Sequence, residues 1–390
     1  MKLLNKLIDN AIFEKRFRDV CYLFNSYTKD ALYIIKDYRL DILKSSKEEY
    51  SKKKEFLDSV VLSEIFNAYD YIFKYIEEPF NVDLITFSDK ELLNACLFLV
   101  NKISNFKSFL PQFNKIPQSY IYYTLAQISQ KYNLIKTSCE AYDKLESLMY
   151  PNEWKEKLEM EILHIRSQPQ IDNETDLPIC YNCLQINPLI NKLGDQCILC
   201  AAPFIRCSLT FEILPLVEFR PKKGISSDLA INYIKMYSLE NIQKKLVSIF
   251  NQEEENNEEN ILNLNKNNNN NENLFEEKLL EFTENQQTTE KYRMLVLDDK
   301  VLKSLNENEV FIMDLRKINK TYPVRFFKNR KRDVNIFMCK NCYKFFKLEE
   351  FENAFLKNGN CCPLCKGVDD DMVLSDYEYE YEYEYEYEYE

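Results

Sequence analysis

The sequence is poor in three residue types on which many enzymes depend. It has four glycines, one histidine and one tryptophan among 390 residues. So little glycine disfavours loops that cradle phosphate, and neither a P-loop nor a G-x-G-x-x-G motif is present. The single histidine, His164, falls in a helical pattern away from every cysteine pair. These shortages argue against a glycine-cradled nucleotide site and against a catalytic zinc with histidine ligands.

The sequence also lacks a basic charge balance and a long apolar run. Its formal net charge is -12 and its pI is about 5.0. Phosphate binding needs a basic surface, so the charge weighs against a nucleic-acid partner. No apolar run approaches the roughly 18 residues that cross a bilayer. We therefore expect no nucleic-acid partner, no direct membrane span, and a soluble chain that reaches membranes through partners.

What the sequence does have is cysteine, thirteen residues in all. Eight of them form two sets, each made of two C-x-x-C pairs: Cys180, Cys183, Cys197 and Cys200; Cys339, Cys342, Cys362 and Cys365. Four thiolates at this spacing can close a tetrahedron around one Zn²⁺. A set of four cysteines is coordinatively full and leaves no open position for a substrate. We therefore predict two structural Zn²⁺ sites and no catalytic metal.

Disulfides and redox chemistry are the other roles of paired cysteines. Disulfides belong to oxidising compartments, whereas this chain shows no signal peptide and has a cytosolic character. C-x-x-C also serves thioredoxin-like enzymes, but two pairs at zinc-ribbon spacing, occurring twice, favour zinc. Cys361 adjoins a predicted ligand, yet only Cys362 has the correct spacing to Cys365. Three other cysteines fall in apolar helical patterns and are predicted core residues: Cys21, Cys96 and Cys139.

Residues 1–167 are predicted to form one helix after another. Apolar residues recur there at three- and four-residue spacings, as on one face of a helix: Phe13, Phe17, Cys21 and Phe24; Val61, Ile65, Tyr69, Ile72 and Ile76. Ser88 followed by Glu91 predicts a capped helix start. Two helices over 119–135 and 136–150, joined near Asn133, predict a helical hairpin. Stacked hairpins indicate a tetratricopeptide-like α-solenoid, which offers partners an extended surface.

The predicted fold class is mainly α: a helical-hairpin, tetratricopeptide-like α-solenoid followed by two small four-cysteine zinc-binding α+β modules. The solenoid end covers 1–167, and the first zinc-binding module, with strands and a helix after it, covers 168–250. A strand segment and the second zinc-binding module cover 291–367. Residues 251–290 are rich in asparagine and glutamate and are predicted to be a disordered insertion. The acidic Tyr-Glu tail, 368–390, is predicted to be disordered as well.

Four shorter stretches carry expectations of their own. Residues 204–219 are rich in β-branched and aromatic side chains and predict one or two strands, and Ser226–Met236 predicts a short helix. The basic stretch RFFKNRKRD, residues 325–333, could contact acidic lipid or nucleic acid. We favour a solvated loop or an interface edge there. FKLEEFENAF, residues 346–355, predicts an amphipathic helix between the cysteine pairs of the second set.

Several segments together resemble the intraflagellar transport protein 122 family. ICYNCLQINPLINKLGDQCILCAAPFI, with FEILPLVEF and GISSDLAINYI after it, is similar to that family's first zinc module. MCKNCYKFF and NGNCCPLC are similar to its C-terminal zinc module, including the doubled cysteine. EEPF and LAQISQKYNLIKTSCEAYDKLESL are similar to its last helical hairpins. The resemblance covers nearly the whole chain apart from the asparagine-rich segment and the tail.

The resemblance implies a non-enzymatic scaffold subunit of intraflagellar transport complex A. The implied partners are the other complex A subunits and, indirectly, the dynein motor and membrane-receptor cargo. The implied work is retrograde transport in cilia and ciliary entry of receptors, at the cilium, the ciliary base and in the cytoplasm. Members of the family carry two N-terminal WD-repeat propellers. This sequence has no WD dipeptide, so we expect it to correspond to the C-terminal part only.

Three other functions compete with this expectation. A RING-like ubiquitin ligase interleaves its two zinc sites, whereas each cysteine set here is complete by itself. A zinc-ribbon nucleic-acid binder conflicts with the acidic charge. A vesicle-coat-type scaffold has the same layout of solenoid and zinc modules, and only the residue-level match to the family separates it from the first expectation.

Overall fold

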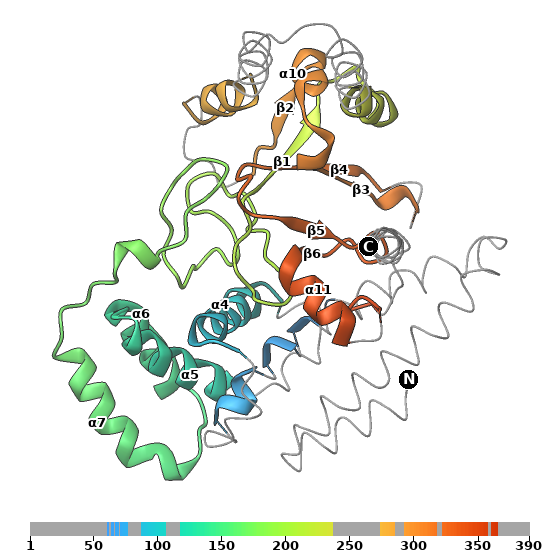
Figure 1. Cartoon of the computed structure of the whole chain (residues 1–390). Helices are drawn as coiled ribbons and strands as arrows, with labels where there is room; N and C mark the ends of the chain where they lie inside the picture. The colour runs from blue at the N-terminus through green and yellow to red at the C-terminus, as the bar shows by residue number, and fades with distance from the viewer. Residues whose placement is uncertain are drawn as a thin grey trace, which may run out of the picture.

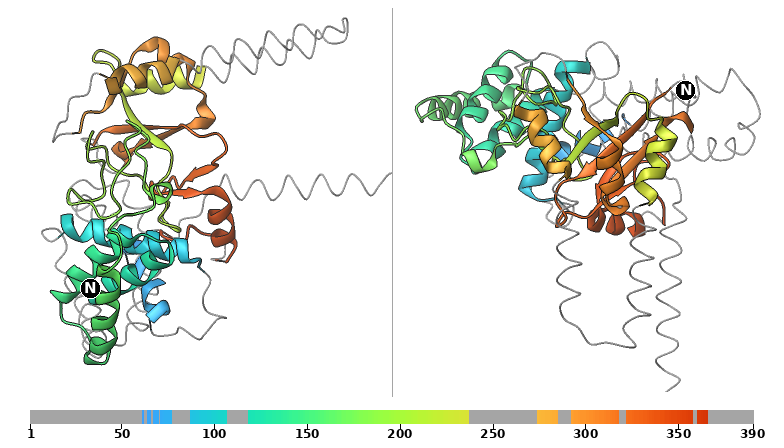
Figure 2. Two further views of the ribbon diagram at one scale, coloured as in Figure 1. Left: turned by 90° about the vertical axis from the view of Figure 1, so that its left-hand side faces the viewer. Right: turned by 90° about the horizontal axis from the view of Figure 1, so that it is seen from above.

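The computed structural model describes most of the chain after residue 60: residues 61, 64–65, 67–69, 71–76, 87–106, 118–236, 274–284, 292–317, 322–357 and 360–365. Helices α4 to α7 gather at one end, a small sheet lies at the other, and irregular segments lie between them (Figures 1 and 2). Three stretches with predictions lie outside the described residues. They are the proposed helix face around Phe13 and Cys21, the parts of the predicted insertion at 251–273 and 285–290, and the Tyr-Glu tail.

Four helices follow one another in the N-terminal half: α4 (Asp89–Phe106), α5 (Gln118–Lys131), α6 (Ile135–Glu146) and α7 (Lys155–Arg166). The predicted cap of α4 is confirmed, because the Glu91 N–H donates to Ser88 Oγ at 3.2 Å and the Ser88 N–H donates back to the Glu91 carboxylate at 2.6 Å. Asn133, with φ of 55°, turns the chain between α5 and α6. The predicted hairpin is thereby confirmed.

The helices share one apolar core. The predicted stripe over 61–76 is buried at Ile65, Tyr69 and Ile72, and Cys96 of α4 is completely buried. Two side chains from the irregular segments also enter this core, Leu189 and Phe211. Burying one large apolar side chain contributes about 1.5–3 kcal/mol. The segments that carry the cysteines are therefore packed against the helices.

A four-stranded sheet has the order β2-β1-β4-β3. Its strands are β1 (Leu216–Pro221), β2 (Leu295–Leu297), β3 (Val310–Asp314) and β4 (Val324–Asn329). β1 pairs in parallel with β2 and antiparallel with β4, so Phe219 lies opposite both Leu295 and Phe326. Both faces of β1 are covered, because Phe219 enters one core cluster and Leu216 another. The sheet therefore joins strands from both sides of the asparagine-rich segment.

Part of that asparagine-rich segment is ordered, which corrects the prediction of disorder over 251–290. Residues 274–284 are helical. Phe275 and Leu279 are buried in the core cluster that also holds Phe219. The prediction of disorder rested on the polar composition of the whole segment and gave no weight to these two apolar residues. Their spacing of four places them on one face of a helix, where the sheet supplies the apolar surface that the segment lacks.

Residues 204–219 were predicted to hold one or two strands, and one strand, β1, is present at their C-terminal end, so the correction concerns its extent. Only 216–219 belong to β1, and residues 207–212 instead form a tight turn flanked by the bridge between Arg206 and Ile213. The helix predicted at Ser226–Met236 is present over 227–236, where Ser226 Oγ accepts the Leu229 N–H.

The second cysteine set lies in a smaller unit. It comprises the antiparallel pair β5 (Ile336–Met338) and β6 (Phe345–Lys347), followed by α11 (Leu348–Lys357). Phe351 and Phe355 of α11 are buried against the cysteines, as predicted for an amphipathic helix. The remaining short elements are α10 (Asp299–Ser304) and the 3-10 turns Asn152–Trp154, Glu174–Asp176, Glu307–Glu309 and Leu315–Lys317. Among the described residues, none of the helices has the length and apolarity that a bilayer crossing requires.

Candidate metal centres

The structure brings together all four cysteines of the first set. The Sγ atoms of Cys180 and Cys200 lie 3.6 Å apart, as do those of Cys183 and Cys197. All four sulfur atoms lie within 4.8 Å of one another. Zn–S bonds of about 2.3 Å in a tetrahedron require sulfur atoms about 3.8 Å apart. The group therefore fits one Zn²⁺.

The second set has the same geometry. The Sγ atoms of Cys339 and Cys365 are 3.7 Å apart, and those of Cys342 and Cys362 are 4.0 Å apart. All four side chains are buried. Cys362, and not its neighbour Cys361, takes the place in the set. A disulfide would need sulfur atoms about 2.05 Å apart, so both sets are thiols arranged around a common centre.

Three of the four pairs sit on a knuckle, a turn that places two sulfur atoms on the same side and is closed by backbone hydrogen bonds. In the first, the Leu184 N–H donates to the Cys180 carbonyl at 2.7 Å, and the Cys180 N–H donates to the Gln185 carbonyl at 2.9 Å. Leu184 closes the turn with φ of 59°. The Cys197–Cys200 and Cys339–Cys342 pairs repeat this pattern, closed by Ala201 and Tyr343 with φ of 52° and 55°. Local hydrogen bonds thus hold the ligands in place.

Polar contacts around the first centre supplement the four sulfurs. Asn182 is buried between the two cysteines of its knuckle and donates from Nδ2 to Cys200 Sγ at 3.6 Å. The Asp195 carboxylate binds Arg206, with 2.8 Å between the closest N and O atoms, and both side chains are more than nine-tenths buried. Gly194, with φ of 88°, makes the turn in front of them. Sequence reasoning missed Asn182, whose only signal is its place inside the C-x-x-C pair.

Hydrogen bonds between the thiols shift their pKa values. The pKa of Cys197 is held well below its ordinary value, chiefly by Cys180, and that of Cys339 chiefly by Cys342. The pKa of Cys180 is raised, chiefly by its hydrogen bond with Cys183. The pKa of Cys200 is lowered as well, to about 7, chiefly by Cys180, so each group contains thiols that lose their protons readily and thiols that keep them. Zn²⁺ needs thiolate ligands, so binding at either centre would release protons.

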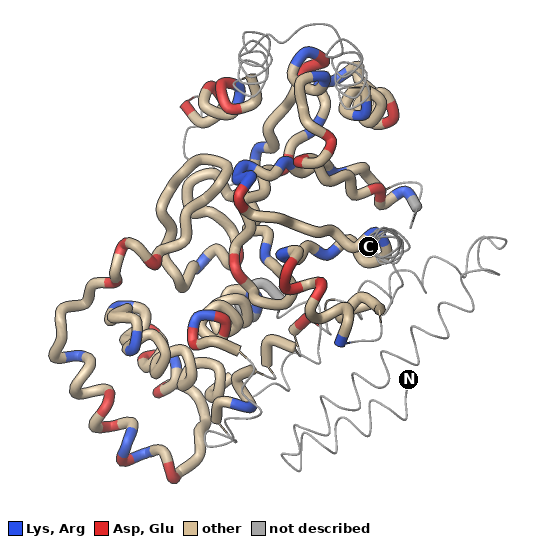
Figure 3. The backbone as a smooth tube through the Cα atoms, in the orientation of Figure 1, with Lys and Arg blue, Asp and Glu red and all other residues tan. Residues whose placement is uncertain are grey.

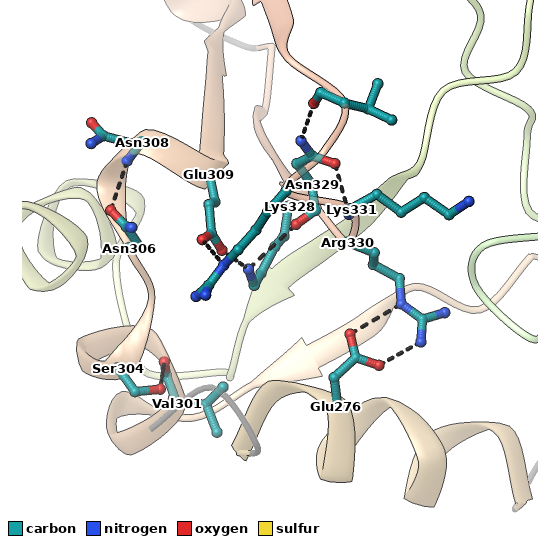
Figure 4. A network of polar contacts seen from close by, with 12 residues as sticks. Glu276, Val301, Ser304, Asn306, Asn308, Glu309, Lys328, Asn329, Arg330 and Lys331 are labelled. Atoms are coloured by element: carbon teal, nitrogen blue, oxygen red, sulfur yellow. Dashed lines mark hydrogen bonds and ion pairs between the residues drawn. The ribbon is translucent and has the colours of Figure 1, made fainter. Parts of the chain in front are cut away.

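Four cations of the basic stretch 325–333 form ion pairs with other parts of the molecule. Arg325 binds the buried Glu218 at 2.6 Å, and Lys328 and Arg332 both bind Glu309. Arg330 pairs with Glu276 of the helical stretch 274–284, as Figure 4 shows. Its Nη1 also donates to the Tyr181 carbonyl in the first knuckle, at 2.6 Å. The stretch is an interface edge within the chain, so these cations are already paired.

The two centres and their surroundings define the class of protein. Two complete four-cysteine groups on knuckles, beside a small sheet and helical hairpins, characterise a zinc-ribbon protein with two structural Zn²⁺ sites. Residues 173–217 match the family model described as "IFT122, zinc ribbon domain". This match covers the first centre from the segment before it to the start of β1.

The chain is similar over nearly its whole length to intraflagellar transport protein 122. The mouse homologue (Mus musculus) is 29% identical over 95% of this chain, the human one (Homo sapiens) 30% over 95%, and the zebrafish one (Danio rerio) 28% over 94%. The resemblance first read from the cysteine segments is thereby confirmed. The matched region is 28–29% of the length of these relatives, so the chain spans less than a third of each.

Proposed function

We propose that this chain works as a scaffold region in intraflagellar transport complex A, with Zn²⁺ held by the eight paired cysteines. The similarity to intraflagellar transport protein 122 over about 95% of the chain carries this proposal. The two four-cysteine groups support it, since a filled tetrahedron stabilises a surface and leaves no position for a substrate. The partners are other subunits of the complex, and the location is the cilium and its base.

The finer parts of the proposal concern transport and cargo. We infer a part in retrograde transport, with indirect contacts to dynein, and in ciliary entry of membrane receptors. The helical hairpin α5–α6 and its neighbours would form the end of a tetratricopeptide-like solenoid. Acidic and basic side chains alternate along α7, which is typical of a solvated outer face (Figure 3). Partner subunits would bind such faces and the surfaces of the zinc modules.

A RING-like ubiquitin ligase is the enzymatic alternative. A RING interleaves its ligand pairs, so that the first and third pairs share one metal. Here the first centre uses the two pairs between residues 180 and 200, and the second uses the two between 339 and 365. This sequential pairing favours structural zinc ribbons. Ubiquitin transfer by the purified chain with an E2 enzyme would overturn the scaffold proposal.

A pull-down tests the proposal directly. The tagged chain is isolated from ciliated cells, its partners are identified by mass spectrometry, and zinc is counted on the same material. We expect complex A subunits together with about two zinc ions per chain, as the two cysteine groups predict. A Cys197→Ser, Cys342→Ser double variant is the matched control and should lose both zinc ions and the partners. Coat subunits in place of ciliary ones would favour the vesicle-coat alternative.

A further inference from the structure

Residues 207–212 repeat the knuckle without a second cysteine. The Phe211 N–H donates to the Cys207 carbonyl at 3.0 Å, and the Cys207 N–H donates to the Glu212 carbonyl at 2.8 Å. Phe211 closes the turn with φ of 57°. An antiparallel bridge between Arg206 and Ile213 flanks this turn, just as the bridge between Ile179 and Ile186 flanks the first knuckle. In backbone terms this is the same device that carries the metal ligands.

The turn at 207–212 is the third knuckle in chain order, and we call it the third knuckle. It has no set of metal ligands. Thr210 occupies the position of the second cysteine. Cys207 and Thr210 are buried, and among the described residues no further cysteine, histidine or carboxylate completes a group around them. The turn forms without a second sulfur, because its hydrogen bonds come from the backbone. The turn is therefore available for packing.

The third knuckle packs against the helices and against the smaller unit that holds the second metal centre. Phe211 is completely buried in the helical core, 5.0 Å from the ring of Phe98 in α4. Leu209 contacts the core cluster of the second metal centre, and its carbonyl accepts the Tyr71 hydroxyl at 3.2 Å. The Ser208 N–H donates to the Phe345 carbonyl of β6 at 2.9 Å. The knuckle therefore joins the helices to that smaller unit.

A buried carboxylate from the helical part ties this junction together. Glu64 is 6% exposed. Its Oε1 accepts from Ser208 Oγ at 2.7 Å, and its Oε2 accepts from Lys344 Nζ at 2.5 Å. The Lys344 carbonyl in turn accepts the Cys339 N–H at 3.0 Å, in the knuckle that presents Cys339 and Cys342. Glu64 thus reaches the ligand backbone of the second centre through a single residue.

We propose that residues 207–212 are a metal-free adapter knuckle, and that Glu64 is a positioning residue for the second metal centre. By holding Ser208 and Lys344 together, Glu64 docks the second zinc module on the helices and slows release of its metal. The first centre is joined to the helices by other residues: Asn101 of α4 bonds Leu189 and Asn191, and Lys102 and Arg206 both pair with Asp195. The two zinc ions should therefore differ in their response to changes at Glu64.

Zinc release from the zinc-loaded full chain tests the positioning role. Glu64→Gln and the parent chain are compared with both centres loaded, and the single variants Cys197→Ser and Cys342→Ser identify which phase of release belongs to which centre. A chromophoric chelator then follows release. We expect about tenfold faster release from the second centre and no change at the first. About tenfold is the lower end of the change in metal affinity seen when residues that support the metal ligands are altered. The exposed α7 residue Glu156, changed to Gln, is the control.

Two outcomes would overturn the positioning role: an unchanged rate at the second centre, or equal acceleration at both centres, which would indicate general loosening. If Glu64→Gln does not fold, Ser208→Ala and Lys344→Met remove its partners singly and together. We expect each to speed release from the second centre, and their effects to be non-additive, since both act through Glu64. Additive effects, or none, would count against it.

The adapter role has its own readout. Cys207→Ser should leave the zinc content at about two ions per chain, because no metal depends on Cys207. A fall in zinc content, or a third ion in the parent protein, would overturn the metal-free assignment. Neither outcome depends on the ciliary function proposed above, because the purified chain alone is measured.

Discussion

The residues that close the knuckles hold a backbone conformation that most side chains avoid. Leu184, Ala201, Phe211 and Tyr343 all have φ between 52° and 59°. Such a residue costs of order 1–3 kcal/mol when it is not glycine. Backbone hydrogen bonds on both sides of each turn offset this, and in three knuckles the metal adds its own stabilisation. A chain with four glycines thus closes these knuckles with other residues.

Removal of one sulfur should empty the first centre. Cys197→Ser leaves three thiolates, and we expect one zinc ion fewer per chain. Residues 180–236 should become looser, while α5 and α6 stay folded on their own core, as followed by hydrogen exchange and metal analysis. The matched Cys139→Ser change, at a half-buried cysteine outside both sets, should leave zinc content unchanged. Equal zinc content in Cys197→Ser and parent would refute the ligand assignment.

Glu350 provides a pH-dependent prediction at the residue scale. Burial raises the pKa of Glu350 above its ordinary value of 4.5. The negative charge of Glu91 raises it further and is the second-largest cause. The folded state therefore holds this proton more tightly than the unfolded state, so stability falls as pH rises above that value. Glu350→Gln should raise the melting temperature at pH 7, and the gain should vanish in acid.

The control for this change lies on the same helix. Glu352 is exposed on α11, and Glu352→Gln should leave the melting temperature nearly unchanged at both pH values. A gain for Glu350→Gln that persists in acid would show that charge is not its cause.

At the scale of elements, the helices follow from local sequence and the sheet does not. α4 and the α5–α6 hairpin were predicted from spacing, a capping box and a turn residue. A strand segment was predicted in 291–367, where β2 and β3 lie, but the order of the strands in the sheet depends on partners far along the chain. The helical stretch 274–284 was hidden by its composition, because its stability comes from the sheet beneath it.

Substitution of Phe275 tests how strongly the helical stretch 274–284 is held against the sheet. The Phe275 ring is 1% exposed and meets Phe219 edge-on at 6.4 Å. Phe275→Ala should cost about 3–5 kcal/mol, seen as a lower denaturant midpoint and early proteolysis within 274–284. Leu280→Ala, on the exposed side of the same helix, should cost less than about 0.5 kcal/mol. Equal protease sensitivity of the two variants would mean that the stretch is not anchored by Phe275.

At the scale of the whole molecule, the metal centres and the helices form one connected structure. Leu189 and Phe211 carry the cysteine segments into the helical core, and Glu64 reaches Lys344 across 280 residues of sequence. Structural zinc contributes about 10–16 kcal/mol of apparent binding energy per site in small fingers. The metal therefore stabilises a large share of the chain indirectly.

Chelation should separate two levels of stability. After both zinc ions are removed, amides in 179–221 and 336–357 should lose hydrogen-exchange protection. α4 should lose part of its protection, because Phe211 leaves its core, whereas α5 and α6 should keep theirs. Re-addition of zinc should restore the parent pattern. Uniform loss over all helices would show instead that the chain unfolds as a single unit.

The sequence by itself determined the features that depend on neighbours a few residues away. The C-x-x-C pairs place two sulfurs on one turn, Ser88 and Glu91 cap a helix, and the stripes of three and four residues define buried helix faces. Those patterns also carried the family resemblance and the two Zn²⁺ sites.

Only the tertiary structure decided what distant residues do to one another. It paired β1 with β2, it paired four cations of the basic stretch 325–333 with carboxylates of the chain, and it formed a knuckle at 207–212, within a segment predicted to hold one or two strands. The physical reason is that hydrogen bonds and ion pairs depend on distance in space. No local sequence pattern predicts the ion pair between Glu64 and Lys344 or the one between Arg330 and Glu276.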